Sequence, residues 1–252
     1  MHRLEPAAET LWQEAAPQVE RTTGILVVDD STLDKPYAKK IALVRRHWSG
    51  KHRAVVEGIN LITLLWTDGD RHVPCDYRLY DKANDELTKN DHFQAMLQAA
   101  CERGFQPACV VFDSWYSSLE NLKTMRDFGW IWLTRLKSNR LVNPDRTGLR
   151  AVSLIATDAR GCIVHLKGYG WIRLFKLVAP DGDFEWWATN DLQMSEVARV
   201  RFAGFAWTIE NYHRGIKQFC GVERAQVRAA KAQRNHIGMA LRAFLRLAAC
   251  RT

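Results

Sequence analysis

Two short apolar runs, each ending in aspartate, constrain this chain more than any other feature of its sequence. Residues 24–28 (Gly-Ile-Leu-Val-Val) lead into Asp29-Asp30-Ser31-Thr32, and residues 108–112 (Ala-Cys-Val-Val-Phe) lead into Asp113. Runs of this length and β-branched content predict buried strands, and we expect a turn at residues 29–32 after the first. Active sites of open α/β sheets form at strand ends, which makes Asp30 and Asp113 candidate site residues.

The remaining periodicity predicts a mixture of strands and helices around these two runs. A hairpin turn is expected at Asp68-Gly69-Asp70, because strand-like stretches flank it on both sides. Helical spacing of apolar residues ends at a glycine in two places, Gly104 and Gly129. The predicted elements are strands at Ala54–Trp66, Val73–Leu79 and Trp130–Thr134, and helices at Asp85–Arg103 and Leu119–Phe128.

The pattern of apolar and turn-forming residues changes after residue 138. Short alternating runs separated by turns containing Gly and Asp predict an antiparallel β insertion. Helical periodicity returns over Met194–Phe219, where we expect one helix, and again over His236–Ala249. We therefore expect a polar lead-in at 1–22, a first part of an α/β core at 23–138, the insertion at 139–190 and a helical part of the core at 191–252.

The balance of charge favours a polyanionic partner. The 252 residues carry a formal net charge of +8, and the sequence pI is near 9.3. The cations form two clusters that would suit a phosphate backbone. Solvated faces that only keep the protein soluble would show the same clustering of charge. One cluster runs from Lys39 through Arg53 with Trp48 inside it, and the other comprises Arg214, Lys217, Arg224, Arg228, Lys231 and Arg234.

Membrane and secretory classes find no support in the sequence. No segment approaches 18 uninterrupted apolar residues, and residues 1–20 contain four glutamates and no apolar signal core. The six cysteines are scattered without a Cys-x-x-Cys pair, so we interpret them as free thiols. We expect a cytoplasmic protein.

A third carboxylate is predicted on the helix over 194–219. Glu210, Arg214 and Lys217 are spaced i, i+4, i+7, which places them on one helical face. A carboxylate there would share its face with cations able to hold a DNA backbone. Two-metal phosphodiester chemistry uses carboxylates around two ions about 3.5–4 Å apart, and Mg²⁺ prefers such oxygen ligands. His213, one residue before Arg214, is interpreted as a surface or core histidine without a metal role.

The residues around Glu210 resemble the third signature of insertion-sequence DDE transposases. In that family a Tyr-x2-Arg-x3-Glu-x6-Lys pattern surrounds the catalytic glutamate. The Glu-x6-Lys half is present here as Glu210 and Lys217, whereas the Tyr and Arg positions hold Ala203 and Ala206. The residues around Asp30 and Asp113 resemble the first and second signatures, and the resemblance spans residues 23–249.

This resemblance implies a fold, a reaction and a set of residues. The fold would be α/β, a ribonuclease-H-like mixed sheet with flanking helices and an antiparallel β insertion before the last catalytic helix. The reaction would be DNA cleavage and strand transfer with two ions of Mg²⁺ or Mn²⁺ held by Asp30, Asp113 and Glu210. Arg214 and Lys217 would contact DNA, the partners would be transposon ends and target DNA, and a homodimer is what the family leads us to expect.

Several alternatives stay open at this point. The chain could be a ribonuclease-H-like nuclease without strand transfer, or a DNA-binding transposase remnant whose catalysis has decayed, as the alanines at 203 and 206 would allow. Asp29 competes with Asp30, because adjacent strand residues point to opposite faces and only one can join the site. If Asp30 is the ligand, Asp29 caps the turn.

Two further expectations concern DNA handling. Trp186 and Trp187 are candidates for stacking on an unpaired base, with packing as the competing role. Residues 1–22 are too few and too acidic for a helix-turn-helix module, so we expect an N-terminally truncated transposase. Such a chain would bind DNA weakly and without sequence preference, nick it weakly with magnesium and perform no independent transposition.

Overall fold

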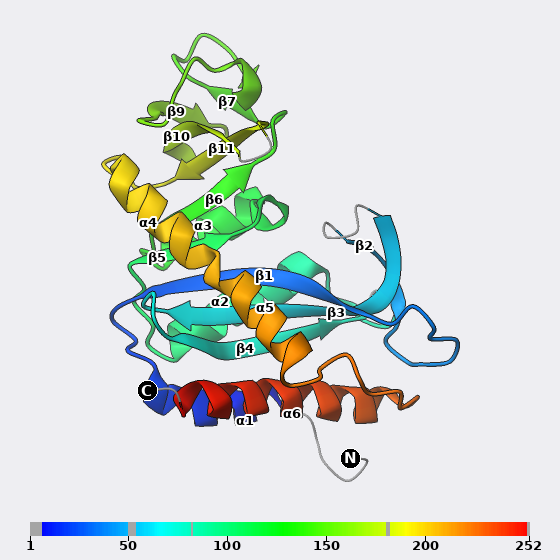
Figure 1. Cartoon of the computed structure of the whole chain (residues 1–252). Helices are drawn as coiled ribbons and strands as arrows, with labels where there is room; N and C mark the ends of the chain where they lie inside the picture. The colour runs from blue at the N-terminus through cyan, green and yellow to red at the C-terminus, as the bar shows by residue number, and fades with distance from the viewer. Residues whose placement is uncertain (1–6, 50–53, 82, 180–181, 251–252) are drawn as a thin grey trace. The chain divides into compact units, whose positions relative to one another are not determined.

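The computed structural model describes residues 7–49, 54–81, 83–179 and 182–250 (Figure 1). Contacts divide the chain into two units. The first comprises residues 1–20, 28–96 and 207–252, and the second comprises residues 21–27 and 97–206. The division falls within strand β1 (Ile25–Asp34) and helix α2 (Lys89–Glu102), so Asp30 and Glu210 belong to the first unit and Asp113 to the second.

Strands β1 to β4 form the sheet of the first unit. β3 (Ala54–Thr67) lies beside β1 and pairs antiparallel with both β2 (Arg45–Ser49) and β4 (His72–Tyr80). The predicted turn between β3 and β4 is confirmed. The Asp68 carboxylate accepts hydrogen bonds from the backbone N–H groups of Asp70 and Arg71, which is the usual role of aspartate in such a turn.

β1 is longer than the sequence predicts, and the expected turn at residues 29–32 is wrong. The strand continues to Asp34, so Asp30 lies within it and Asp29 does not cap a turn. The reason is the neighbouring strand. β3 runs for 14 residues, and at Gly58 a Cβ atom would lie 2.5 Å from the Leu33 carbonyl oxygen. Glycine therefore lets the far half of β1 approach β3 closely and remain in the sheet.

Helices α1 (Ala8–Ala15) and α6 (Ala230–Ala249) pack together beside β4 (Figure 1). α1 buries Leu11, Trp12 and Ala15 there. α6 begins six residues before the predicted start at His236, and its buried residues include Ile237, Leu241 and Leu245. Helix α5 (Thr208–Gln218) contacts both β4 and α6.

The second unit contains a mixed sheet. β5 (Cys109–Phe112) is parallel to β6 (Trp132–Leu136), and α3 (Leu119–Asp127) lies between them in sequence. β6 then pairs antiparallel with β11 (Phe184–Thr189), and an antiparallel series of strands continues from β11. This series consists of β10 (Gly170–Val178), β9 (Cys162–Leu166), β7 (Leu141–Asn143) and β8 (Arg150–Ala151). Helix α4 (Glu196–Ala206) packs against β5 and β6.

The expected single helix over Met194–Phe219 is two helices. α4 ends at Ala206 and α5 begins at Thr208, with Trp207 between them. Trp207 keeps helical dihedral angles, and its carbonyl accepts an i, i+3 hydrogen bond from the N–H of Glu210 at 3.1 Å. A one-residue break of this kind scarcely alters the apolar period, which explains why periodicity predicts one continuous helix.

Mixed strands and flanking helices confirm the predicted α/β class. The described residues also include three short 3₁₀ segments: η1 (Ala16–Gln18), η2 (Ser114–Tyr116) and η3 (Val152–Leu154). Within the described residues, no helix has the length and apolar character that crossing a membrane requires.

Candidate active site

Asp30 is held by two polar side chains in the first unit. Its Oδ2 accepts hydrogen bonds from Asn60 Nδ2 at 2.6 Å and from Lys89 Nζ at 2.8 Å. The Asp30 side chain keeps 20% of its surface exposed, and Lys89 keeps 17%. These two contacts, one of them with an ammonium group, fix the orientation of the Asp30 carboxylate.

Helix α5 is fastened to β1 by Lys217. The Lys217 ammonium donates to the carbonyl oxygen of Thr32 at 2.9 Å and forms an ion pair with Glu223 at 3.3 Å. Thr32 and Asp30 are two residues apart on β1 and therefore point to the same face of the strand. The lysine predicted to hold DNA thus holds the strand that carries Asp30.

His213 is a buried residue of α5 and lies one turn before Lys217. It is 5% exposed, and its Nε2 has no hydrogen-bond partner among the described residues. Burial lowers the pKa of His213 to about 4, with a smaller lowering by Lys217 and an opposing effect of Asp30. The imidazole is therefore neutral at pH 7 and adds no positive charge beside Asp30.

Glu210 and Arg214 occupy the exposed side of the same helix. Glu210 lies in the first turn of α5, where the helix dipole favours a carboxylate. Neither side chain forms an ion pair among the described residues. Of the two cations predicted to bind DNA, Arg214 is the one whose charge faces solvent.

Asp113 stands at the end of β5 in the second unit, as the sequence predicts. It is the N-cap of η2, and its Oδ1 accepts a hydrogen bond from the backbone N–H of Trp115 at 3.3 Å. The half-buried side chain borders a cavity of about 430 Å³. The other residues lining this cavity are Ser114, Arg135, Leu136, Ser138, Phe184, Glu185 and Trp186.

The two tryptophans of β11 differ in their surroundings. Trp187 donates from Nε1 to Glu185 at 2.9 Å and lies beneath the Arg135 guanidinium, 5.8 Å from the ring centroid. Arg135 and Glu185 are themselves paired at 2.8 Å. Trp186 lines the cavity next to Asp113, and its Nε1 is buried without a hydrogen-bond partner among the described residues.

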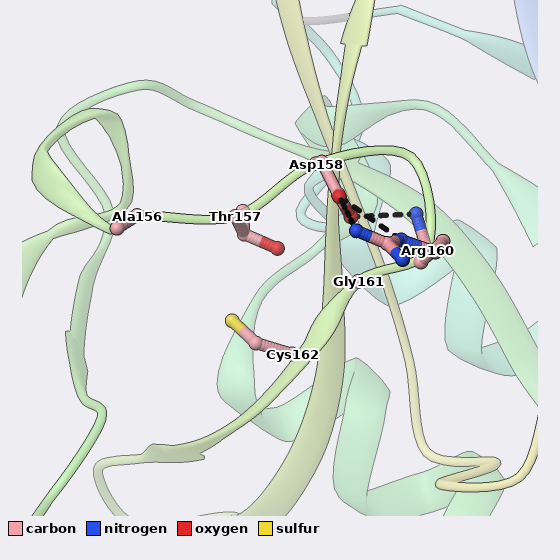
Figure 2. A pocket seen from close by; sticks show the side chains of 6 residues that line it. All are labelled: Ala156, Thr157, Asp158, Arg160, Gly161 and Cys162. Carbon is pink, nitrogen blue, oxygen red and sulfur yellow. Dashed lines mark hydrogen bonds and ion pairs between the residues drawn. The ribbon is translucent and has the colours of Figure 1, made fainter.

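A second cavity of about 420 Å³ lies at the turn before β9, and none of the predicted site residues lines it (Figure 2). Figure 2 shows its only two charged side chains pointing at each other, and Arg160 Nη2 donates to Asp158 at 3.0 Å. The turn is also tied to β10, because Lys176 donates its backbone N–H to the Asp158 carbonyl at 3.0 Å. These contacts indicate a structural turn.

The sequence did not single out Asn60, Lys89, Glu223 or the buried Lys35. Asn60 carried a usable signal, since it is a lone amide inside the apolar run of β3. The others carried none, because each acquires its role from a partner far away in sequence. Across the described residues, no three His, Cys, Asp or Glu side chains lie together as a metal site would require.

Comparison with known proteins identifies the family. A profile of the DDE superfamily endonucleases matches residues 2–153, more than half of the chain. The matched span includes Asp30 and Asp113 and ends before Glu210. No curated protein matches the sequence.

A solved structure supports the fold independently. The chain is similar to a piggyBac transposase from a synaptic complex with hairpin DNA, with a TM-score of 0.57 and 9% identity. The likeness covers 89% of this chain but only 46% of that one, so this chain spans less than half the length of that transposase. At this identity the likeness shows the ribonuclease-H-like fold alone. By the profile match over residues 2–153, the chain belongs to the DDE superfamily endonucleases.

Proposed function

We propose that this chain cuts DNA phosphodiesters and joins the freed 3′ end to target DNA, as the catalytic core of a DNA transposase. The observation that carries the proposal is the family match, which contains two aspartates that each follow a buried apolar run. Asp30, Asp113 and Glu210 are the carboxylates we assign to catalysis.

Carboxylates are donors that divalent cations prefer, and we propose that these three, which do not form a metal site in the described structure, hold two ions of Mg²⁺ or Mn²⁺. All three assigned side chains are carboxylates, and none of them is fully buried. Hard oxygen donors with access to water suit these ions, which keep several water ligands. When bound, such ions lower the pKa of an attacking water and stabilise charge on the phosphate oxygens.

The residues around Asp30 orient its carboxylate and balance its charge in the absence of a metal ion. Lys89 supplies the positive charge that the carboxylate needs, and Asn60 fixes the orientation of Oδ2. The neutral His213 nearby does not repel an incoming cation. We propose that Lys89 gives up Asp30 when the protein is loaded with metal.

DNA is the proposed partner, and Arg214 is the proposed backbone contact next to Glu210. Its guanidinium is exposed one turn after the carboxylate, in a position to pair with a phosphate. Lys217 donates one of its three N–H groups to Thr32 and forms an ion pair with Glu223, so part of its donor capacity remains for DNA.

For an unpaired base, we assign stacking to Trp186 rather than Trp187. The Trp187 ring is already engaged by Glu185 and Arg135, whereas Trp186 borders the cavity beside Asp113. Trp186→Ala should impair end processing, while Trp187→Ala should act through stability. Equal processing by the Trp186→Ala variant and the unaltered chain would remove this assignment.

The decisive experiment is cleavage of supercoiled plasmid with Mg²⁺ and with EDTA. Nicking should require the metal and should be abolished in Asp30→Asn, Asp113→Asn and Glu210→Gln, while Asp29→Asn stays active. A labelled oligonucleotide with a 3′-hydroxyl then reports strand transfer. Cleavage without transfer would leave a nuclease, binding without cleavage would leave a decayed transposase, and activity in all three variants would refute the assigned site.

A further inference from the structure

The structure brings one segment of each basic cluster of the sequence together. The loop at residues 35–44 lies against the connection at residues 221–229, which leads from α5 to α6. Ala42 donates its backbone N–H to the carbonyl oxygen of Arg228 at 2.9 Å. Asp34 donates its backbone N–H to Glu223 Oε1 at 3.0 Å, so both ends of the loop are fixed to the connection.

A buried lysine, Lys35, connects the loop to the connection at the place where they meet, which we call the junction. Lys35 is 3% exposed, and its ammonium donates to the carbonyl oxygens of Glu223 and Ala225, the latter at 2.7 Å. Burial lowers the pKa of Lys35, while the Glu223 carboxylate opposes that shift. An ammonium buried on two carbonyls of another segment holds the backbone of both segments in a fixed register.

Four cations project from this junction into solvent. Lys39 and Lys40 are exposed on the loop, and Arg224 and Arg228 are exposed on the connection. None of the four forms an ion pair with any residue that the structure describes. The acidic side chain within the connection, Glu223, is paired with Lys217. The surface is therefore a fixed block of positive charge.

We infer that this junction surface, comprising Lys39, Lys40, Arg224 and Arg228, binds the phosphate backbone of duplex DNA. The inference rests on the proposed function, because it takes DNA as the partner, and it adds a contact surface outside the assigned carboxylates and Arg214. Charge complementarity supports this inference, because cations on two segments that are bonded to each other can replace the counterions of DNA. Backbone contacts of this kind position the duplex and do not read its sequence.

The test is the salt dependence of binding to a duplex of about 30 base pairs, measured by fluorescence anisotropy in EDTA so that no cleavage occurs. Two double variants remove one half of the surface each: Lys39→Ala with Lys40→Ala, and Arg224→Ala with Arg228→Ala. Each should weaken binding and reduce the slope of log K against log salt by about 2, at roughly 0.9 for each phosphate that is no longer neutralised. The same weakening is expected with an unrelated duplex sequence.

A matched control carries the same change in net charge. Arg150→Ala with Lys167→Ala removes two exposed cations from the second unit. This control should leave the slope unchanged. An equal drop in the control would assign the effect to net charge, and unchanged slopes in both test variants would overturn the inference.

A separate variant tests the junction itself. Lys35→Met keeps all four exposed cations but removes the tie to Glu223 and Ala225, and it should reduce the slope in protein that remains folded by circular dichroism. The control Arg150→Ala with Lys167→Ala should also cleave DNA at the unaltered rate, because it changes no assigned carboxylate and no residue of the junction surface. If the protein cuts DNA but the slope of log K against log salt is unchanged in the two double variants, only the inference about the junction surface is refuted. If the protein binds no duplex, both proposals are refuted.

Discussion

The Lys217 ammonium group donates a hydrogen bond to the carbonyl oxygen of Thr32, 185 residues away in sequence, at 2.9 Å. This bond connects the helix that carries Glu210 to the strand that carries Asp30. The bond gives Lys217 a structural role, whereas the sequence pattern assigns this lysine to DNA binding. The two roles can be separated by experiment.

Lys217→Met should destabilise the protein, whereas Arg214→Ala should not. The first change leaves Glu223 without its cation and the Thr32 carbonyl without its donor, at a cost of about 1–3 kcal/mol. The second removes an exposed side chain and should stay within about 0.5 kcal/mol while reducing the DNA salt slope by about 1. Urea denaturation and anisotropy titrations measure both. Unchanged stability of Lys217→Met would return that residue to a purely DNA-binding role.

Lys89→Met should strengthen divalent-metal binding. The Lys89 ammonium pairs with Asp30 at 2.8 Å, and a metal ion must displace it to reach the same oxygen. Removing this competitor should increase Mn²⁺ affinity on the order of tenfold, equivalent to about 1.4 kcal/mol. Isothermal titration calorimetry without DNA measures the change, with Lys40→Met as an exposed control. Weaker Mn²⁺ binding in Lys89→Met would mean that Lys89 supports the site and does not compete for it.

Gly215→Ala should impair the position of α5 without touching any carboxylate. Glycine-to-alanine changes inside helices ordinarily stabilise by about 1 kcal/mol. Here the new Cβ would lie 2.6 Å from Phe244 Cε2, and the Phe244 ring also packs edge-on against Tyr212 at 5.0 Å. Overpacking of this kind costs about 1–3 kcal/mol, so the net effect should be lower stability and slower cleavage. Adding Phe244→Leu should restore both, and failure of that rescue would disprove the packing explanation.

The free energy of unfolding should depend on pH through His213. The imidazole takes up its proton near pH 6.5 when unfolded but only near pH 4 when folded. Between these values the unfolded state binds more protons, so stability falls as the pH is lowered from 6.5 to 4, by about 3 kcal/mol in total. Below pH 4 both states are protonated and the decline stops.

The contribution of His213 can be isolated by difference. Urea denaturation in EDTA, with unaltered protein and His213→Gln compared at each pH, removes the common effects of other groups. The difference between the two should shrink steadily from pH 6.5 to pH 4. A constant difference over this range would show that His213 titrates alike in both states.

The sequence by itself determined the local elements and the identity of the candidate carboxylates. Alternation and turn chemistry are enough to place β3, the Asp68–Asp70 turn and β4, because those features depend on neighbouring residues. The runs before Asp30 and Asp113 likewise predict buried strands, and both are observed. The α/β class follows from the order of these elements.

Tertiary structure decided what the local pattern could not express. β1 passes through Asp30 to Asp34 because β3 offers a long partner edge, and a turn signal within residues 29–32 cannot reveal that edge. The partners of Asp30, Lys89 and Asn60, are 59 and 30 residues away, and Glu223 meets the N–H of Asp34 across 189 residues. Such contacts form only when distant segments pack, because burial of one segment against another fixes which polar groups must pair.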